Sequence, residues 1–305
     1  MADGHDETRQ KDRTSPKFAA KRAATERIAA ARAAEARAAR RRNVMVAGGS
    51  ILAVVIVIGA IVAYGLSHKK KTVAGSGNPV VPASATVTAG LTKAAAATAA
   101  LTDLSAVTGP PSRLTGAALT AASGKPQVLY VGAEYCPYCA ITRWPLAVAL
   151  TRFGTFSNLQ TTTSSSTDQN PNTPTLSFHG ASYKSDYIDF ASIEQEDGLG
   201  KPLESTTAAQ EKLFESLAGG SYPFIDFGGK WMQKGANADG TVLAGLTPDS
   251  VATQISDPTS KIGSNVQQGA DIFTAIICGM DGGKPANVCT APGVTTAVTA
   301  LSAIK

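Results

Sequence analysis

The sequence feature that most constrains the fold is an apolar run that passes directly into a short cysteine motif. Residues 127–133, Gln-Val-Leu-Tyr-Val-Gly-Ala, predict a strand buried on both faces. The chain continues as Glu-Tyr-Cys-Pro-Tyr-Cys-Ala through residue 140. Apolar residues then recur at helical spacing to about Phe153, which predicts a largely buried helix. The pattern indicates a strand, a turn that carries two cysteines, and a helix.

These two cysteines, Cys136 and Cys139, have the spacing that disulfide exchange requires. Pro137 suits the first helical position, where its missing N–H costs nothing, so Cys136 is predicted to cap the helix with its sulfur outward. Helix-terminal N–H groups lower the pKa of a thiol placed there, and the thiolate is the species that attacks. Cys139 lies one turn further in. We therefore predict Cys136 as the attacking nucleophile and Cys139 as the resolving thiol.

Other uses of the motif fit the sequence less well. Structural zinc needs four ligands, usually in two close pairs, but Cys278 and Cys289 are eleven positions apart and His179 is the one histidine after residue 72. Haem attachment needs a histidine where Ala140 stands. A purely structural disulfide across two residues stays open, although it would be strained and reducible. We expect no metal and no cofactor.

An uncharged segment of 23 residues, Val44 to Leu66, is long enough to span a bilayer core. It is too long, and begins too far along the chain, for a cleaved signal peptide. Six arginines between residues 27 and 42 outnumber Lys69 to Lys71 on the other side, which predicts a cytoplasmic N-terminus. Residues 67–305 are then expected outside the cytoplasm, with the protein in the cell membrane as a single-pass protein.

All four cysteines follow this segment, so they are expected in a compartment where disulfides persist. Cys278 and Cys289, an even and separate second pair, most simply form a structural disulfide that ties the last two helices. A relay that passes electrons to Cys136 and Cys139 is the alternative.

The formal net charge of +5 is distributed unevenly. Residues 1–43 carry 12 Lys and Arg against 6 Asp and Glu, whereas residues 72–305 carry 13 against 17. The basic character belongs to the tail, so it gives no support to nucleic-acid binding. The predicted organisation is a cytoplasmic basic tail at 1–43, a transmembrane helix at 44–66, an extracytoplasmic stalk at 67–110 with one helix over Leu91 to Val107, and a folded domain at 111–305.

Downstream patterns predict further elements. Leu176 to Ile193 is expected to hold two short strands. Thr207-Ala-Ala-Gln210 has capping-box spacing and opens a helix that Gly219-Gly220 ends. Tyr222 to Phe227 predicts a strand, and Gly228-Gly229 predicts a two-residue hairpin to the next one.

The segment Glu134-Tyr-Cys-Pro-Tyr-Cys139, together with Tyr222-Pro223, resembles the thioredoxin superfamily, and its Pro-Tyr dipeptide is typical of glutaredoxins. The resemblance implies a cis-proline at Pro223 and a substrate-binding loop formed with Tyr222. From Gly124 to Cys139 the chain more closely resembles an actinobacterial family of membrane-tethered thioredoxin-like proteins, known only as a domain of unknown function. The resemblance covers about Pro111 to the end.

Three departures from the thioredoxin pattern matter. Tyr130 stands where thioredoxin has a buried aspartate, so the proton acceptor that helps a reductant is missing. Glu134 matches an acid near the motif and is interpreted as a surface carboxylate. The chain between motif and Pro223 is longer than in a minimal thioredoxin, so Thr161 to Leu217 is expected to be an inserted subdomain.

The predicted fold is an α/β, thioredoxin-like sandwich with an insertion before the cis-proline strand, preceded by one transmembrane helix. The predicted function is that of a membrane-anchored, extracytoplasmic thiol-disulfide oxidoreductase acting on protein thiols or disulfides of envelope or secreted proteins, together with an unknown redox partner. Oxidase or isomerase is favoured over reductase. The alternative is a cell-envelope binding or scaffold module whose cysteine pair is not catalytic.

Overall fold

The computed structural model describes residues 79–97, 104–116 and 118–304. The chain divides into two compact units, residues 1–71 and 72–305, and every described residue belongs to the second. The basic tail and the membrane span predicted within residues 1–66 lie outside the described residues. None of the helices formed by the described residues has the length and apolar character needed to cross a membrane.

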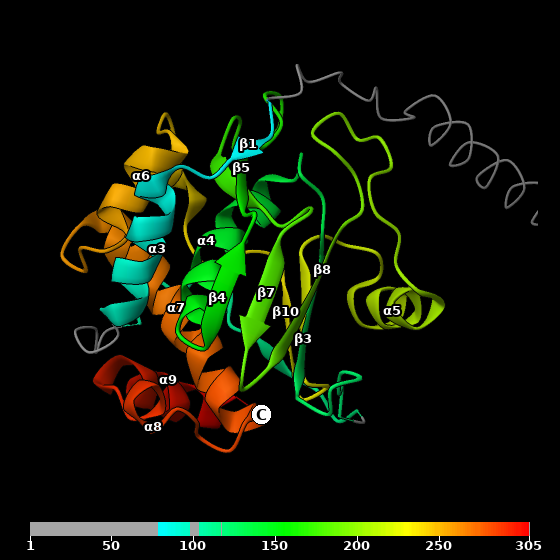
Figure 1. Ribbon diagram of the computed structural model, residues 1–305, viewed down its shortest axis with the longest axis vertical. Helices are drawn as coiled ribbons and strands as arrows, with labels where there is room; N and C mark the ends of the chain where they lie inside the picture. Colours follow the sequence, from blue (N-terminus) through cyan, green and yellow to red (C-terminus); the bar gives the residue numbers. More distant parts are fainter. Residues whose placement is uncertain (1–78, 98–103, 117, 305) are drawn as a thin grey trace, which may run out of the picture. The chain divides into compact units, whose positions relative to one another are not determined.

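The described chain contains both strands and helices, and elements of the same kind often follow one another (Figure 1). The strands are β1 (Val81–Pro82), β2 (Ser112–Arg113), β3 (Gln127–Gly132), β4 (Gly154–Ser157), β5 (Gln160–Thr163), β6 (Pro174–Ser177), β7 (Ser182–Ser185), β8 (Asp189–Glu194), β9 (Phe224–Phe227) and β10 (Trp231–Lys234). The helices are α3 (Ala85–Ala96), α4 (Pro137–Thr151), α5 (Ala208–Leu213), the π-helical η1 (Phe214–Ala218), the 3-10 helix η2 (Gly240–Leu243), α6 (Pro248–Gln254), α7 (Lys261–Met280), α8 (Ala286–Cys289) and α9 (Pro292–Ser302).

The strands of the described residues form three sheets. The largest has the order β2-β10-β9-β3-β8, with β3 parallel to β8 and antiparallel to β9. The smaller sheets are β1-β5-β6 and β4-β7, both antiparallel. Gly228 and Gly229 turn the chain between β9 and β10 with φ values of 62° and 69°, a left-handed conformation that glycine adopts without strain.

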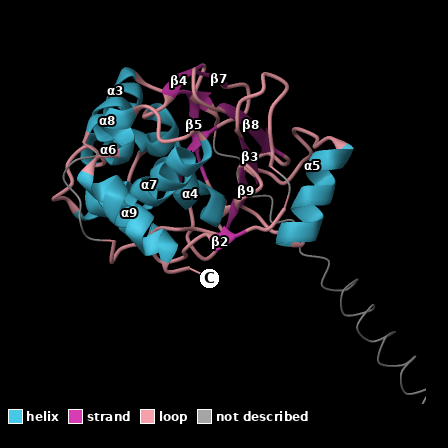
Figure 2. Ribbon diagram, turned by 90° about the horizontal axis from the view of Figure 1, so that it is seen from below, coloured by secondary structure: helices cyan, strands magenta, loops and turns pink. Residues whose placement is uncertain are grey.

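Strand β3 is buried on both faces. Val128 and Tyr130 pack in the main core, while Leu129 and Val131 pack in a smaller cluster on the opposite face. In both ribbon views α4 and α7 lie on one side of the five-stranded sheet and α5 on the other (Figures 1 and 2). A continuous apolar run is what a strand covered on both faces requires.

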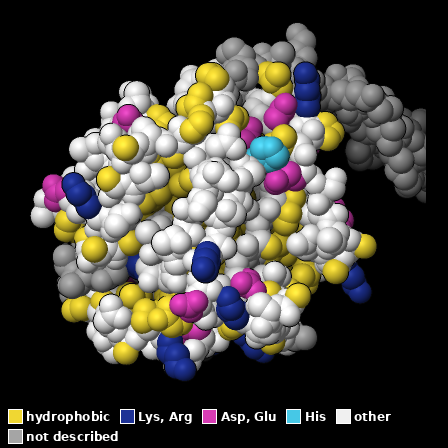
Figure 3. All heavy atoms as spheres, in the orientation of Figure 1, with side chains coloured by type: hydrophobic (Ala, Val, Ile, Leu, Met, Phe, Trp, Pro, Cys, Tyr) yellow, Lys and Arg dark blue, Asp and Glu magenta, His cyan; other side chains and the backbone are white. Residues whose placement is uncertain are grey.

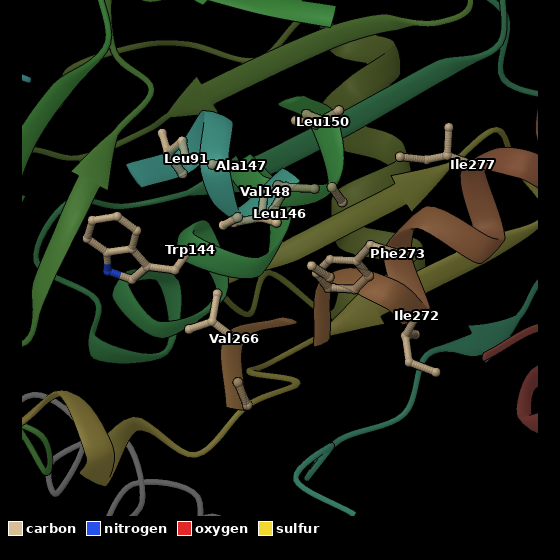
Figure 4. Close-up of a cluster of buried hydrophobic side chains, with 14 of the residues drawn as sticks. Leu91, Trp144, Leu146, Ala147, Val148, Leu150, Val266, Ile272, Phe273 and Ile277 are labelled. Carbon is tan, nitrogen blue, oxygen red and sulfur yellow. The ribbon is translucent and has the colours of Figure 1, made fainter. Parts of the chain in front are cut away.

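Helices α4 and α7 contribute many of the buried side chains of the main core (Figure 4). Trp144 is fully buried, and its Nε1 donates to the Pro174 carbonyl at 2.9 Å. Arg152, directly after α4, forms a buried ion pair with Asp271 of α7 at 2.6 Å and also donates to Thr274. The two helices are therefore joined by apolar packing and by a buried ion pair. The side chains packed there include Leu146, Ala147, Val148, Leu150, Val266, Ile272, Phe273 and Ile277.

Helix α3 falls within the segment for which we predicted a stalk. Ser84 caps it, accepting a hydrogen bond from the Val87 amide at 3.2 Å and donating to Asp249 at 2.6 Å. Val87 and Leu91 are buried in the main core, where α3 packs against α4 and α6. These residues therefore belong to the folded unit. The helix begins earlier than predicted because its cap contacts a residue far along the chain, which local composition does not register.

The predicted fold class is corrected by the structure. We expected one central sheet in a thioredoxin-like sandwich, with an inserted subdomain at 161–217 and a transmembrane helix before it. The described residues instead form a mixed α/β unit with three separate sheets. The segment predicted as an insertion supplies β8, which pairs in parallel with β3 in the five-stranded sheet. It also supplies β6 and β7. Residues 176–193, predicted to hold two short strands, therefore contribute to three: β6, β7 and β8.

The surface of the described unit mixes charges of both signs. Figure 3 shows Lys, Arg, Asp and Glu side chains interspersed over the face in view, with hydrophobic side chains scattered between them. This distribution gives that face no single-sign electrostatic field.

Candidate active site

Cys136 caps the N-terminus of α4. Its backbone is extended (φ −72°, ψ 120°), and its Sγ accepts a hydrogen bond from the Cys139 amide at 3.2 Å. Pro137 begins the helix, where its missing N–H removes no helical hydrogen bond. The local sequence therefore places one sulfur at the positive end of the helix dipole.

Both motif thiols are free and both are buried. Cys136 keeps 6% of its surface exposed and Cys139 none. The outward sulfur predicted for Cys136 is thus corrected, because Tyr135 and Tyr222 pack against the small cluster of Ala133 and the two cysteines and leave little surface free. Of the two cysteines, only Cys136 has solvent-exposed surface that a substrate could contact.

The pKa values of the two thiols shift in opposite directions. A hydrogen bond from the Cys139 thiol, assisted by the Cys139 amide, holds the pKa of Cys136 below its ordinary value despite burial. Burial raises the pKa of Cys139 well above its ordinary value, and the neighbouring Cys136 sulfur adds to this rise. The pair therefore ionises first at Cys136.

The loop before β9 packs against this pair. The Tyr222-Pro223 peptide bond is cis, the geometry that the resemblance implied. Tyr222 contacts the cysteine cluster, its ring stacks on Phe214 with 5.4 Å between centroids, and its hydroxyl donates to Gln195 at 2.6 Å. The structure thus brings Tyr222 beside the thiols from a distant part of the sequence.

A cleft of about 470 Å³ adjoins the motif. Tyr138, which lies between the two cysteines and is 41% exposed, lines it together with Tyr222 and Ile141. Lys234 and Asp239 contribute charges of opposite sign to the lining. The cleft therefore adjoins the thiols through Tyr138 and Tyr222.

A buried ion pair near the thiols was missed in the sequence. Arg143 of α4 donates from Nε and Nη2 to the two carboxylate oxygens of Glu194 at 2.8 and 2.6 Å, and neither side chain is exposed. Nη2 also donates to the Ala133 carbonyl at 2.8 Å. Two sequence signals pointed to this pair: an arginine inside an apolar helical stripe, and a glutamate directly after Ile193 in a strand pattern.

Glu134 differs from its sequence interpretation. Glu134 is 2% exposed, and burial raises its pKa above the ordinary value. The prediction of a surface carboxylate is wrong, because Ser177 at the end of β6 lies against the carboxylate and donates to it at 2.7 Å. Burial also raises the pKa of Tyr130 well above its ordinary value, so this phenol stays protonated.

Cys278 and Cys289 are bonded to each other, with their Cα atoms 5.7 Å apart, and they join α7 to α8. The disulfide lies near the start of β3: Met280, two residues after Cys278, lies against Gly228, and the Gly228 amide donates to the Gln127 carbonyl. Cys136 lies beyond the other end of β3, four residues after Gly132. The two cysteine pairs are therefore separated by about the length of a six-residue strand, roughly 20 Å. This separation argues against a direct relay between them.

The fold and site define a class of protein: a mixed α/β unit with a dithiol at a helix N-terminus and a cis-proline loop packed against it. A family model described as Domain of unknown function (DUF929) matches residues 116–279, more than half of the chain. The chain belongs to this family. No curated protein and no solved structure matches it. Within the described ranges, no three His, Cys, Asp or Glu side chains gather as a metal site.

Proposed function

We propose that the protein is a thiol-disulfide oxidoreductase that works through Cys136 and Cys139. The observation that carries the proposal is a pair of free thiols at one helix N-terminus with pKa values shifted in opposite directions. Exchange requires one thiol that ionises readily and a second that takes up a proton when it leaves. The resemblance of the motif to the thioredoxin superfamily supports the same chemistry.

In the oxidising direction, a substrate thiolate attacks Cys136 Sγ of the Cys136–Cys139 disulfide. Cys136 is the target because it alone of the two has exposed surface. The S–S bond breaks, and Cys139 leaves with its electron pair and takes up a proton, as its raised pKa requires. A second substrate thiolate then attacks the substrate sulfur of the mixed disulfide and releases Cys136 as a thiolate. Isomerisation begins instead with attack by the Cys136 thiolate on a substrate disulfide.

Substrate access is proposed to run through the cleft beside Tyr138 and Tyr222. Both tyrosines line the cleft, and Tyr222 also packs against the thiols. A polypeptide segment held in the cleft therefore lies next to the small exposed surface of Cys136. Partly exposed tyrosines suit such contacts, because they combine a large apolar ring with a hydroxyl.

The proposal includes a location outside the cytoplasm. The Cys278–Cys289 disulfide supports it, because such bonds persist in oxidising compartments. The arginine-rich tail supports a cytoplasmic N-terminus, with residues 44–66 as the proposed attachment to the cell membrane. The substrates are then thiols or disulfides of envelope or secreted proteins, and an unknown partner resets the redox state of the pair.

The second candidate is a binding or scaffold module of the cell envelope. The observation that favours it is the near-complete burial of both motif cysteines. In this case the pair would stay in one redox state, and the cleft beside Tyr138 would serve recognition alone.

One experiment separates the two candidates. Oxidised full-length protein, purified in detergent, is incubated with reduced, unfolded ribonuclease, and recovery of ribonuclease activity is followed. The wild type and the Cys278→Ala/Cys289→Ala control should both promote recovery, whereas Cys136→Ala should not. Recovery that is equal with and without the wild-type protein would support the scaffold module.

A further inference from the structure

A buried positive charge lies within one helical turn of the resolving thiol. Arg143 follows Cys139 by four positions on α4, so the two side chains share a helix face. Neither is exposed. Arg143 donates to the Ala133 carbonyl at 2.8 Å, and Ala133 packs against Cys136 and Cys139. The guanidinium therefore donates a hydrogen bond to Ala133, the residue that packs against both cysteines.

Glu194 fixes the position of this charge. Its carboxylate accepts two parallel hydrogen bonds from Arg143, a geometry that orients the planar guanidinium more strictly than a single contact does. The parallel pairing of β3 and β8 sets Gly132 opposite Glu194. The carboxylate thus lies at the end of β3, where the motif loop begins.

Stability alone does not account for this ion pair. Apolar residues often replace buried ion pairs without loss of stability, and Arg152 with Asp271 already links α4 to the core. Arg143 Nη1 and the Tyr130 hydroxyl are both buried, and within the described part of the chain neither has a hydrogen-bond partner. Arg143 therefore keeps one N–H donor without a partner in addition to its pairing with Glu194.

The thiolates are charges that this arginine can stabilise. After the hydrogen bonds from Cys139, the charge of Arg143 is the next influence that lowers the pKa of Cys136. Burial raises the pKa of Cys139, and Arg143 opposes that rise more strongly than Glu194 adds to it. A disulfide carries no charge, so a group that stabilises thiolates favours the reduced pair over the oxidised one.

We infer that Arg143 is a positioning residue that favours the reduced Cys136–Cys139 pair, so that the disulfide form of the protein oxidises substrate dithiols. This inference rests on the proposed function and gives it a direction. In the net reaction two substrate thiols become one disulfide, and their two electrons reduce the Cys136–Cys139 bond. One of the two protons is taken up by Cys139, and the other is taken up by Cys136 or passes to solvent, according to whether Cys136 is a thiol or a thiolate.

The direction is tested with the wild-type protein. Oxidised full-length protein is mixed with an equal amount of reduced thioredoxin, and alkylation measures the thiols of both at equilibrium. The equilibrium constant should favour reduced Cys136–Cys139 and oxidised thioredoxin at least tenfold. An even partition, or one that leaves Cys136–Cys139 oxidised, overturns the inference. A pair that exchanges with no dithiol contradicts the proposed function itself, so the two failures are distinct.

The role of Arg143 is tested with matched variants. Arg143→Met with Glu194→Met removes both charges at similar volume and should lower this equilibrium constant at least tenfold. Arg152→Met with Asp271→Leu removes the other buried ion pair of α4 and should change it less than threefold. Equal changes in the two double variants, or no change in the first, overturn the role.

A third variant keeps the test valid even when the first double variant does not fold. Arg143→Lys retains the charge and should keep the equilibrium constant within threefold of the wild type. A tenfold loss in Arg143→Lys shows that the charge is not the cause and also overturns the role.

Discussion

Removal of the Cys278–Cys289 disulfide tests how firmly the C-terminal helices are held. The bond joins residues 11 positions apart, and the chain-entropy relation for a loop of that length gives about 2.8 kcal/mol at 25 °C. For a unit of this size, each kcal/mol changes Tm by about 2–4 °C. Cys278→Ala with Cys289→Ala should therefore lower Tm by about 6–11 °C. The native packing should persist, because Val294 and Ala297 of α9 are fully buried.

The assay is thermal unfolding of the full-length protein, followed by circular dichroism at fixed protein and detergent concentration. Cys136→Ala with Cys139→Ala is the control, since it removes the same number of sulfur atoms without opening a covalent loop of the reduced protein. A decrease of less than about 2 °C would refute the reasoning, because it would correspond to less than about 1 kcal/mol. In that case the packing of α9 on α7 would hold the helices without help from the bond.

Three further predictions concern the site. Cys139→Ala should accumulate covalent complexes with protein substrates on non-reducing gels, and Cys136→Ala should accumulate none; the reverse result would exchange the roles of the two thiols. Alkylation of the reduced protein over a pH series should find Cys136 ionising below about 8.5 and Cys139 above it, and two equal titrations would contradict this. Because burial raises the folded-state pKa of Glu134, its contribution to stability is present at low pH and is lost as the pH rises through that pKa. Glu134→Gln keeps an acceptor for Ser177 and should flatten this loss in urea unfolding; an unchanged pH profile would count against it.

Local signals in the sequence predicted local features of the fold. The Thr207 capping box forms as its spacing indicated, with reciprocal hydrogen bonds to Gln210. Gly228 and Gly229 turn the chain as predicted, although the loop has three residues, 228–230, and not two, and Pro137 begins α4. Each of these features depends on residues within one turn of each other, so the sequence window that contains them also contains their physical cause.

Features that depend on distant residues were missed. Arg143 and Glu194 are 51 positions apart, and each looks like an isolated charge until β8 pairs with β3. The burial of Glu134 depends on Ser177, 43 positions away. The strand β8 itself was assigned to an insertion, because no local pattern tells which strand will pair with the free edge of β3.

The pairing of β3 with β8 also has a consequence for assembly of the protein. Side chains alternate between the faces of a strand, so a slip of one residue would turn Glu194 toward the face where Ile193 packs and leave Arg143 buried without its carboxylate. Breaking a buried ion pair costs about 3–5 kcal/mol, so misaligned chains would be rare. The contact proposed to tune the thiols therefore also selects the strand alignment: a molecule with the wrong alignment keeps the Arg143 charge but lacks the carboxylate that holds it in position.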